Sequence, residues 1–289
     1  TTYIYTRLDS SAASVVYKRQ ALDSFDKAPG DTSVILSPMT PESLLASRYL
    51  LTVLEGDRRR ASRLILDAAD EGRPIQEILL RVLLPAQVEI GRMWQADEIN
   101  VAEEHFVSET TKTVMAQLIS YADCAPSNGR TMLAASVAGN QIEIGLYAVA
   151  CFFELDGWQT INLGANVPTA EIVQAVDSFE ADLLGLSASQ STQLQTVRKT
   201  IDAVRSSPRG SNAKIIVGGF AFAGFEHLPR RLGADGFARD PADAVNLGAR
   251  LVFGTTQATR EKPLSSTRAL SNVHGANRET AVTCQPSSQ

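Results

Sequence analysis

The sequence predicts a two-part protein, in which a bundle of four helices precedes a doubly wound, parallel α/β sheet. Through residues 40–121 apolar side chains recur at helical spacing with short breaks between the runs. Beyond the polar, turn-rich stretch at 125–130, short apolar strands alternate with helical segments. Repeated β-α units of this length imply a parallel sheet with helices on both faces, as in Rossmann- and flavodoxin-like domains. We therefore expect a bundle over 40–124 and an α/β domain over 130–254.

Caps and turn residues mark the four helices of the predicted bundle. Thr40 caps the first helix and is followed by a proline in the first turn, and Asp57 caps the second. Pro85 lies inside the third helix and predicts a kink there. The expected helices cover residues 40–56, 57–72, 74–94 and 101–121.

The α/β half is predicted from five short apolar strands, each followed by a helical segment. Strands are expected near residues 132–137, 160–163, 183–186, 215–217 and 236–237. Helices are expected near residues 144–156, 168–179, 192–206, 225–232 and 242–253.

The two ends of the chain differ from the middle. Residues 1–39 form an extension in which the pattern predicts one amphipathic helix over 12–25. Residues 255–289 are rich in serine, threonine, arginine and asparagine and poor in apolar residues, which predicts a flexible tail. Neither segment carries a motif that assigns it a function.

Composition argues against a nucleic-acid-binding protein, a membrane protein and a protein stabilised by zinc or disulfides. The formal net charge is −5 and no long basic run occurs, which argues against direct nucleic-acid binding. No apolar run reaches the length of a membrane span and no signal-peptide pattern is present, so we expect a cytoplasmic protein without membrane contact. The three cysteines are far apart in sequence, which favours neither a zinc site nor a disulfide framework.

Three signals fall where predicted strands end. Ala138–Gly145 follows the first strand, Ser187-Ala-Ser189 ends the third, and Gly218-Gly219 ends the fourth. Open α/β sheets bind ligands at the carboxyl ends of their strands. A hydroxyl and paired glycines at this edge favour a bulky ligand lying against the backbone, although a lone Gly-Gly is also typical of a tight turn.

This order of motifs resembles the cobalamin-binding domain of methionine synthases, corrinoid methyltransfer proteins, mutases and cobalamin photoreceptors. That family has the pattern Asp-x-His-x-x-Gly, Ser-x-Leu, Gly-Gly, and Gly145, Ser187, Gly218 and Gly219 match it. The resemblance implies that the serine and the glycines receive the nucleotide tail of the cofactor.

Three positions depart from the family pattern. Asn140 replaces the aspartate, Ile142 the histidine and Ser189 the leucine. In the family the histidine ligates cobalt from below. Isoleucine has no lone pair, so we assign no metal ligand at this position.

A second motif, Trp-x9-Glu-His, consists of Trp94, Glu104 and His105. A tryptophan or a histidine on a helix is more often packing or solvated surface than a ligand contact. The motif, however, resembles the one in the helical bundle of light-sensing cobalamin regulators. There the tryptophan and the Glu-His pair cover the 5′-deoxyadenosyl group on the upper cobalt face.

Together the two resemblances predict a set of cofactor-binding residues and no catalytic residue. The set is Trp94, Val101, Glu104, His105, Asn140, Gln141, Ile142, Gly145, Leu163, Gly164, Asn166, Val167, Ser187, Ser189, Gly218, Gly219, Phe220 and Gly236.

The leading hypothesis is a non-catalytic light sensor that holds adenosylcobalamin between bundle and sheet, and signals by a light-dependent change in homo-oligomeric state or by docking an effector protein. The apolar Ile142 allows a second tetrapyrrole, such as biliverdin, at the lower face. Two alternatives share the fold: a corrinoid shuttle protein of a methyltransferase system, and a haem or bilin sensor. The light-sensing regulators usually carry a helix-turn-helix domain, which we do not expect here.

Overall fold

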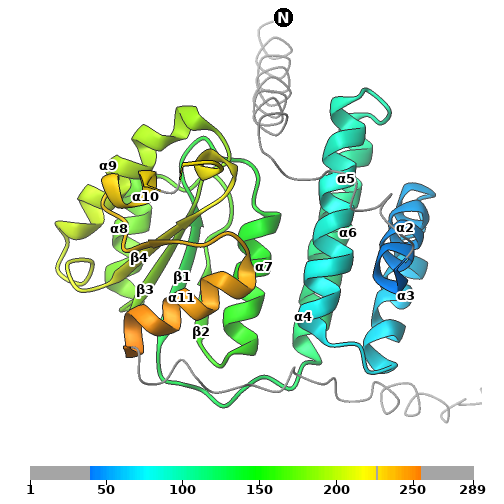
Figure 1. The fold of residues 1–289 in the computed structure, drawn as a ribbon, viewed down its shortest axis with the longest axis horizontal. Coiled ribbons are helices and arrows are strands. Elements are labelled where there is room, and N and C mark those ends of the chain that lie inside the picture. Colours follow the sequence, from blue (N-terminus) through cyan, green and yellow to red (C-terminus); the bar gives the residue numbers. More distant parts are fainter. Residues whose placement is uncertain (1–39, 226, 255–289) are drawn as a thin grey trace, which may run out of the picture.

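The structure, a computed structural model, describes residues 40–225 and 227–254. A helical region is followed by a parallel sheet flanked by helices, so the predicted fold class is confirmed (Figure 1). The helix predicted at 12–25 and the tail predicted at 255–289 lie outside the described residues. Within the described residues, no helix combines the length and apolar character that crossing a membrane requires.

The helical region begins and ends its helices close to the predicted positions. Thr40 caps the first helix, because its hydroxyl oxygen accepts a hydrogen bond from the Ser43 backbone N–H at 3.1 Å. Asn100 caps the last helix in the same way, with Glu103 completing a capping box. The helices are α2 (Pro41–Leu54), α3 (Arg58–Asp70), α4 (Ile75–Ile78), α5 (Leu84–Gln95) and α6 (Val101–Ser120).

The third predicted helix is divided by a π-helical segment, η2 (Leu79–Leu83), between α4 and α5. Pro85 is the second residue of α5, and because α5 continues directly from η2, proline removes an N–H that a regular helix would use there. The wider π turn therefore accommodates the proline without ending the helical path. This is the form that the predicted kink takes.

The α/β half is a five-stranded parallel sheet in the order β2-β1-β3-β4-β5. The strands are β1 (Thr131–Ser136), β2 (Gln159–Asn162), β3 (Leu183–Ser187), β4 (Lys214–Gly218) and β5 (Gly236–Phe237). The helices are α7 (Ile144–Leu155), α8 (Thr169–Ser178), α9 (Leu194–Arg205), α10 (Leu228–Arg231) and α11 (Pro241–Phe253), with short 3-10 segments η3 (Ser191–Gln193) and η4 (Phe220–Phe222). The helix predicted over 225–232 is thus shorter than expected.

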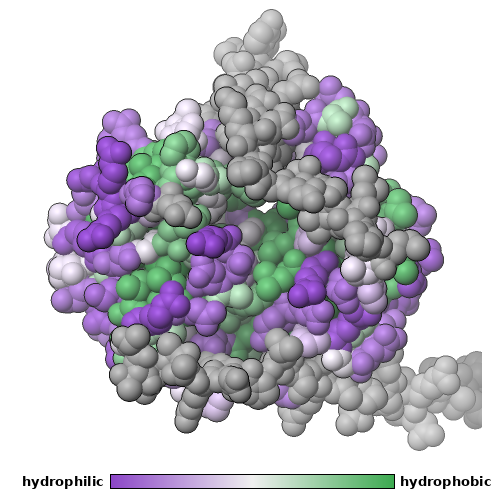
Figure 2. All heavy atoms as spheres, viewed as in Figure 1, coloured by the Kyte–Doolittle hydropathy of each residue, from purple (hydrophilic) through white to green (hydrophobic). Residues whose placement is uncertain are grey.

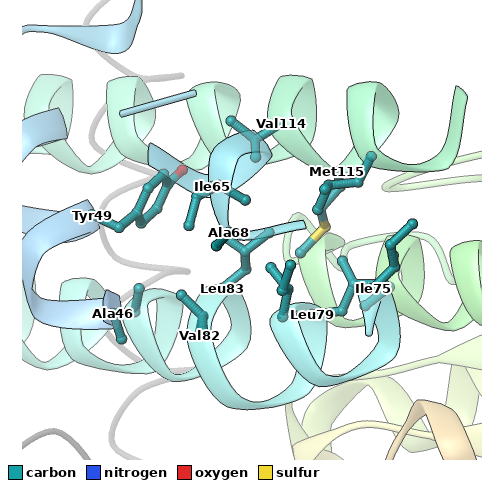
Figure 3. Close-up of a cluster of buried hydrophobic side chains, with 14 of the residues drawn as sticks. Ala46, Tyr49, Ile65, Ala68, Ile75, Leu79, Val82, Leu83, Val114 and Met115 are labelled. Atoms are coloured by element: carbon teal, nitrogen blue, oxygen red, sulfur yellow. The ribbon is translucent and has the colours of Figure 1, made fainter. Parts of the chain in front are cut away.

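Helix α7 belongs to two cores at once. Its residues Cys151 and Phe152 pack in the same buried cluster as Tyr49 and Met115 of the bundle. Its residue Phe153 faces the sheet in another cluster. Figure 3 shows the bundle cluster, in which Tyr49 lies beside Ile65. Because one helix is buried on both sides, the bundle and the sheet are joined through a shared apolar layer rather than by a loose linker.

Candidate functional site

The three sequence signals meet at one edge of the sheet. Ser136 at the end of β1 pairs with Ser187 at the end of β3, and Ser187 pairs with Gly218 at the end of β4. The strand order reverses between β1 and β3, because β2 lies on the far side of β1. Ligands of open parallel sheets bind at such a reversal point.

Asn140 ties the loop after β1 to the end of β3. Its side chain is almost fully buried, with 1% of the residue exposed. The amide nitrogen donates to the Ser187 carbonyl oxygen at 3.2 Å and lies 3.4 Å from the Ser136 hydroxyl, while the amide oxygen accepts from the Ile142 N–H at 3.3 Å. An amide both donates and accepts, which an ionised aspartate cannot do. Asparagine at this position therefore both donates to the end of β3 and accepts from its own loop.

Two further side chains, Gln193 and Asn166, fix the loops against one another. The Gln193 amide nitrogen donates to the Gly139 carbonyl at 2.9 Å, and its oxygen accepts from the Ser189 N–H at 2.9 Å. The Asn166 side-chain oxygen accepts from the Gly139 N–H at 2.7 Å. Asn166 was predicted as a site residue, whereas Gln193 and Ser136 were missed. The spacing of Gln193 from Gln190, which resembles a capping box, was the available signal.

The glycines at this edge have different reasons to be glycine. Gly219 has a φ of +99°, and a Cβ there would overlap the Ala188 carbonyl oxygen. Around Gly145, on the first turn of α7, an added Cβ would meet nothing within 4 Å, so its backbone is accessible to a ligand. Gly236 lies on the edge strand β5 opposite Ile216, and the space beside it is filled by Leu247 of α11. Packing accounts for Gly236.

Other predicted residues surround the same edge. Leu163 and Val167 are half-buried and pack against the core of the sheet. Ile142 is half-buried, Gln141 is exposed, and Phe220 is 37% exposed at the start of η4. The apolar members of this set, all but Gln141, form an apolar rim beside the polar loops. On the face of the molecule that Figure 2 shows, apolar surface lies near the centre, where the α/β half meets the bundle.

An ion pair that the sequence did not predict joins the bundle to this edge. The Lys112 ammonium of α6 lies 2.8 Å from the Glu143 carboxylate in the loop before α7, and 2.7 Å from Glu109. Burial favours the neutral amine, but the two carboxylates outweigh that effect and raise the pKa of Lys112. The charged pair therefore persists at neutral pH. Glu143 also borders Gly164, where a Cβ would lie 2.8 Å from its carboxylate.

The second motif lies on the same side of the bundle. Helical spacing places Val101, His105, Ser108 and Lys112 on one face of α6, and Lys112 directs that face toward the sheet edge. The His105 ring nitrogen Nδ1 lies 3.1 Å from the Glu104 carboxylate, with 55% of the His105 side chain and 17% of the Glu104 side chain exposed. Trp94 is buried in the last turn of α5.

A groove of about 440 Å³ lies elsewhere, between the end of α2 and the first turn of α6. Leu54, Asn100 and Phe106 are among its lining residues, and neither Glu104 nor His105 lines it. We therefore place the candidate site at the sheet edge and not in this groove.

Comparison with known proteins matches both halves of the chain. Residues 130–246 and residues 45–119 match two family models, each described as a B12 binding domain. The chain is 29% identical over 193 residues to the HTH-type transcriptional repressor CarH of Myxococcus xanthus, covering 66% of this chain and 61% of that protein. It is 22% identical over 193 residues to dimethylamine corrinoid protein 3 of Methanosarcina acetivorans, covering 65% of this chain and 90% of that protein.

A solved structure shares the fold. The monomethylamine corrinoid protein of Methanosarcina barkeri superposes with a TM-score of 0.59 at 18% identity, covering 72% of this chain and 98% of that one. At this identity the likeness shows the arrangement of helices and strands, and it does not extend to the chemistry of the site.

Proposed function

Because this chain belongs to the B12-binding domain family, we propose that it is a light-sensing module that holds adenosylcobalamin between the helical bundle and the carboxyl edge of the sheet. The cofactor would supply a cobalt–carbon bond that light breaks. Ser187, Gly218 and Gly219 would receive its nucleotide tail. The fit rests on the open backbone at Gly145, where an added Cβ would meet nothing within 4 Å, beside loops that are already held in place.

One observation carries the light-sensing assignment. The Glu104 carboxylate and the His105 ring lie 3.1 Å apart on the face of α6 that Lys112 directs toward the sheet edge, and Trp94 is in the last turn of the neighbouring helix. A planar ring and an acid–imidazole pair suit a ligand that is flat on one side and carries polar groups on the other. We propose that these side chains, called the cap below, contact the upper ligand only. The match to the CarH repressor supports this reading.

The lower side is proposed to be apolar. Ile142 offers no lone pair, and the exposed Phe220 extends the apolar rim. We propose that a second planar pigment, such as biliverdin, packs here by stacking and dispersion. Ile142→His tests this, since an imidazole there should shift the visible spectrum of the bound cobalamin and obstruct the second pigment. An unchanged spectrum would contradict the proposed position of the lower face.

A second candidate function is a corrinoid shuttle that serves a methyltransferase. Its support is the match to the dimethylamine corrinoid protein, which extends over 90% of that protein. Ile142 argues against the shuttle function, because the family pattern places a cobalt-ligating histidine at this position. The cap would also have no role in a shuttle protein. In either function we assign no catalytic residue to this chain.

Reconstitution in the dark with adenosylcobalamin or methylcobalamin separates the two functions. The sensor should bind both, bleach under light in the adenosyl form, and elute from a sizing column at different volumes in light and dark. His105→Ala, at an exposed side chain, should keep cobalamin affinity within about threefold while losing selectivity for the adenosyl form. Retained selectivity together with an unchanged light–dark shift in this variant would refute the role of the cap. The change in assembly, or the effector protein it recruits, is the proposed output.

A further inference from the structure

A chain of polar side chains runs from the Glu104 carboxylate into the interior of the bundle. The Ser108 hydroxyl lies 3.0 Å from a Glu104 oxygen and 3.1 Å from the Gln87 amide oxygen. The Gln87 amide nitrogen donates to the Thr111 hydroxyl oxygen at 2.7 Å, and Thr111 lies 2.9 Å from the Tyr49 hydroxyl. The chain therefore connects three helices: α6, α5 and α2.

The direction of the inner hydrogen bonds follows from counting protons. Thr111 has one hydroxyl proton, which it donates to the Val107 carbonyl at 2.9 Å. Its oxygen must then accept from both Gln87 and Tyr49. Tyr49 is fully buried, and burial raises the pKa of its hydroxyl to about 12, so it remains a donor at neutral pH. The inner end of the chain is thus fully satisfied and fixed in direction.

The outer end has one proton for two acceptors. The single hydroxyl proton of Ser108 faces both the Gln87 amide oxygen and the Glu104 carboxylate, and it can serve one of them at a time. A bond to a charged carboxylate is the stronger of the two. When the carboxylate engages another partner, the proton can turn to Gln87. Ser108 therefore responds to what Glu104 contacts.

We propose that Gln87 and Ser108 are positioning residues of the cap, which hold the Glu104 carboxylate and link its state to the Tyr49–Thr111 contact in the bundle core. This inference rests on the proposed function insofar as Glu104 faces the upper ligand. Loss of that ligand changes the partner of Glu104, and Ser108 redirects its proton to the Gln87 amide oxygen. The Gln87 side chain then shifts against Thr111, which contacts Tyr49 of α2. The bundle then has a physical route by which an event at the cap alters its packing.

The first test needs no cofactor. In protein with ¹³C-labelled glutamate, the side-chain carboxyl resonance of Glu104 is identified by its absence in Glu104→Gln. We expect Ser108→Ala and Thr111→Val to change the chemical shift of this resonance. Thr111→Ser should give the chemical shift of the parent protein, and Thr113→Val should leave the shift unchanged. Thr113 is the matched control, because its hydroxyl donates to the Glu109 carbonyl of its own helix and takes no part in the chain of polar side chains. An unmoved resonance in both chain variants, or an equal shift in Thr113→Val, overturns the proposal.

The second test uses protein loaded with adenosylcobalamin. Ser108→Ala and Thr111→Val should retain the bound cobalamin and its bleaching, but reduce the light–dark difference in elution volume at least twofold, with Thr111→Ser behaving as the parent protein. An undiminished difference overturns the proposed link to the core. If the parent protein shows no light response while the resonance still shifts, the light-sensing function fails and the positioning of Glu104 stands.

Discussion

The loops at the sheet edge and the cap on α5 and α6 are built in opposite ways. The loops are held by hydrogen bonds within the α/β half, from buried Asn140 and from Gln193 to backbone groups. The cap consists of side chains alone, of which His105 is more than half exposed while Trp94 is buried. Loops that are fixed before binding are well suited to bind the part of a ligand that stays the same. Side chains that can move are better suited to contact a part of the ligand that light removes. We therefore assign tail binding to the edge and selectivity to the cap.

The largest expected effect is at Gly219, compared with Gly224. Both have positive φ, +99° and +78°, but only at Gly219 would a Cβ overlap a carbonyl oxygen, that of Ala188. Gly219→Ala should lower the free energy of unfolding by about 3 kcal/mol and abolish cobalamin uptake. Gly224→Ala should lose about 1 kcal/mol and retain uptake. Urea unfolding and cobalamin absorbance after gel filtration measure both, and equal uptake by the two variants would mean that the tail lies elsewhere.

Asn140→Asp tests whether the loop depends on a donor at this position. An ionised carboxylate cannot donate to the Ser187 carbonyl, so the variant should lose about 2 kcal/mol of stability at pH 7. Part of that loss should be recovered at lower pH, because a protonated carboxyl can donate again. Urea midpoints of variant and parent between pH 4 and 7 would show this, and a difference that does not depend on pH would contradict it.

Alkaline pH should weaken the bundle core beneath the cap. Burial raises the pKa of Cys151 to about 12 and that of Tyr49 to about 12. Both groups ionise at lower pH in the unfolded chain, so the folded state keeps protons that the unfolded state loses. The free energy of unfolding does not change with these groups while the pH is below their pKa values in the unfolded chain. It falls as pH rises from there toward 12, by about 1.4 kcal/mol per pH unit for each group that is ionised in the unfolded chain but not in the folded one. Cys151→Ala should flatten the profile above pH 9, and the exposed Cys124→Ser should change it less.

The smallest expected effect concerns the ion pair between the two regions. Lys112→Met should lower stability by about 1 kcal/mol, because both partners are largely buried and Glu143 loses its cation. Asp202→Asn removes an exposed pair with Arg198 and should cost less than about 0.5 kcal/mol. Equal losses in urea unfolding would mean that the Lys112 pair does not fix the bundle against the sheet edge.

The sequence predicted elements better than contacts between them. Caps such as Thr40 and glycine stops are local signals, so helix and strand positions followed from them. The π segment before Pro85 was not predicted, because how a helix absorbs a proline depends on the surrounding packing. At the edge, the signals at Ser187 and Gly219 were recognisable because they constrain the backbone itself.

Side-chain partners distant in sequence were the part that the sequence could not supply. Gln193 bonds a loop more than fifty residues away, and Lys112 meets Glu143 across the two halves. A glutamine or a lysine in a sequence does not predict a specific partner, since both residue types are most often solvated. Helical spacing puts Lys112 on the same face of α6 as His105. That spacing does not reveal that the Glu143 carboxylate lies opposite.

The most direct test of the central claim is the visible absorbance spectrum of the protein purified in the dark from cells supplied with cobalamin and biliverdin, recorded before and after illumination. We predict bands of alkylcobalamin that change irreversibly in light, together with bilin bands that are weakened by Ile142→His. Cobalamin bands that light leaves unchanged, or a purified protein without cobalamin bands, would contradict the proposal that this chain senses light through a cobalamin held between its bundle and its sheet.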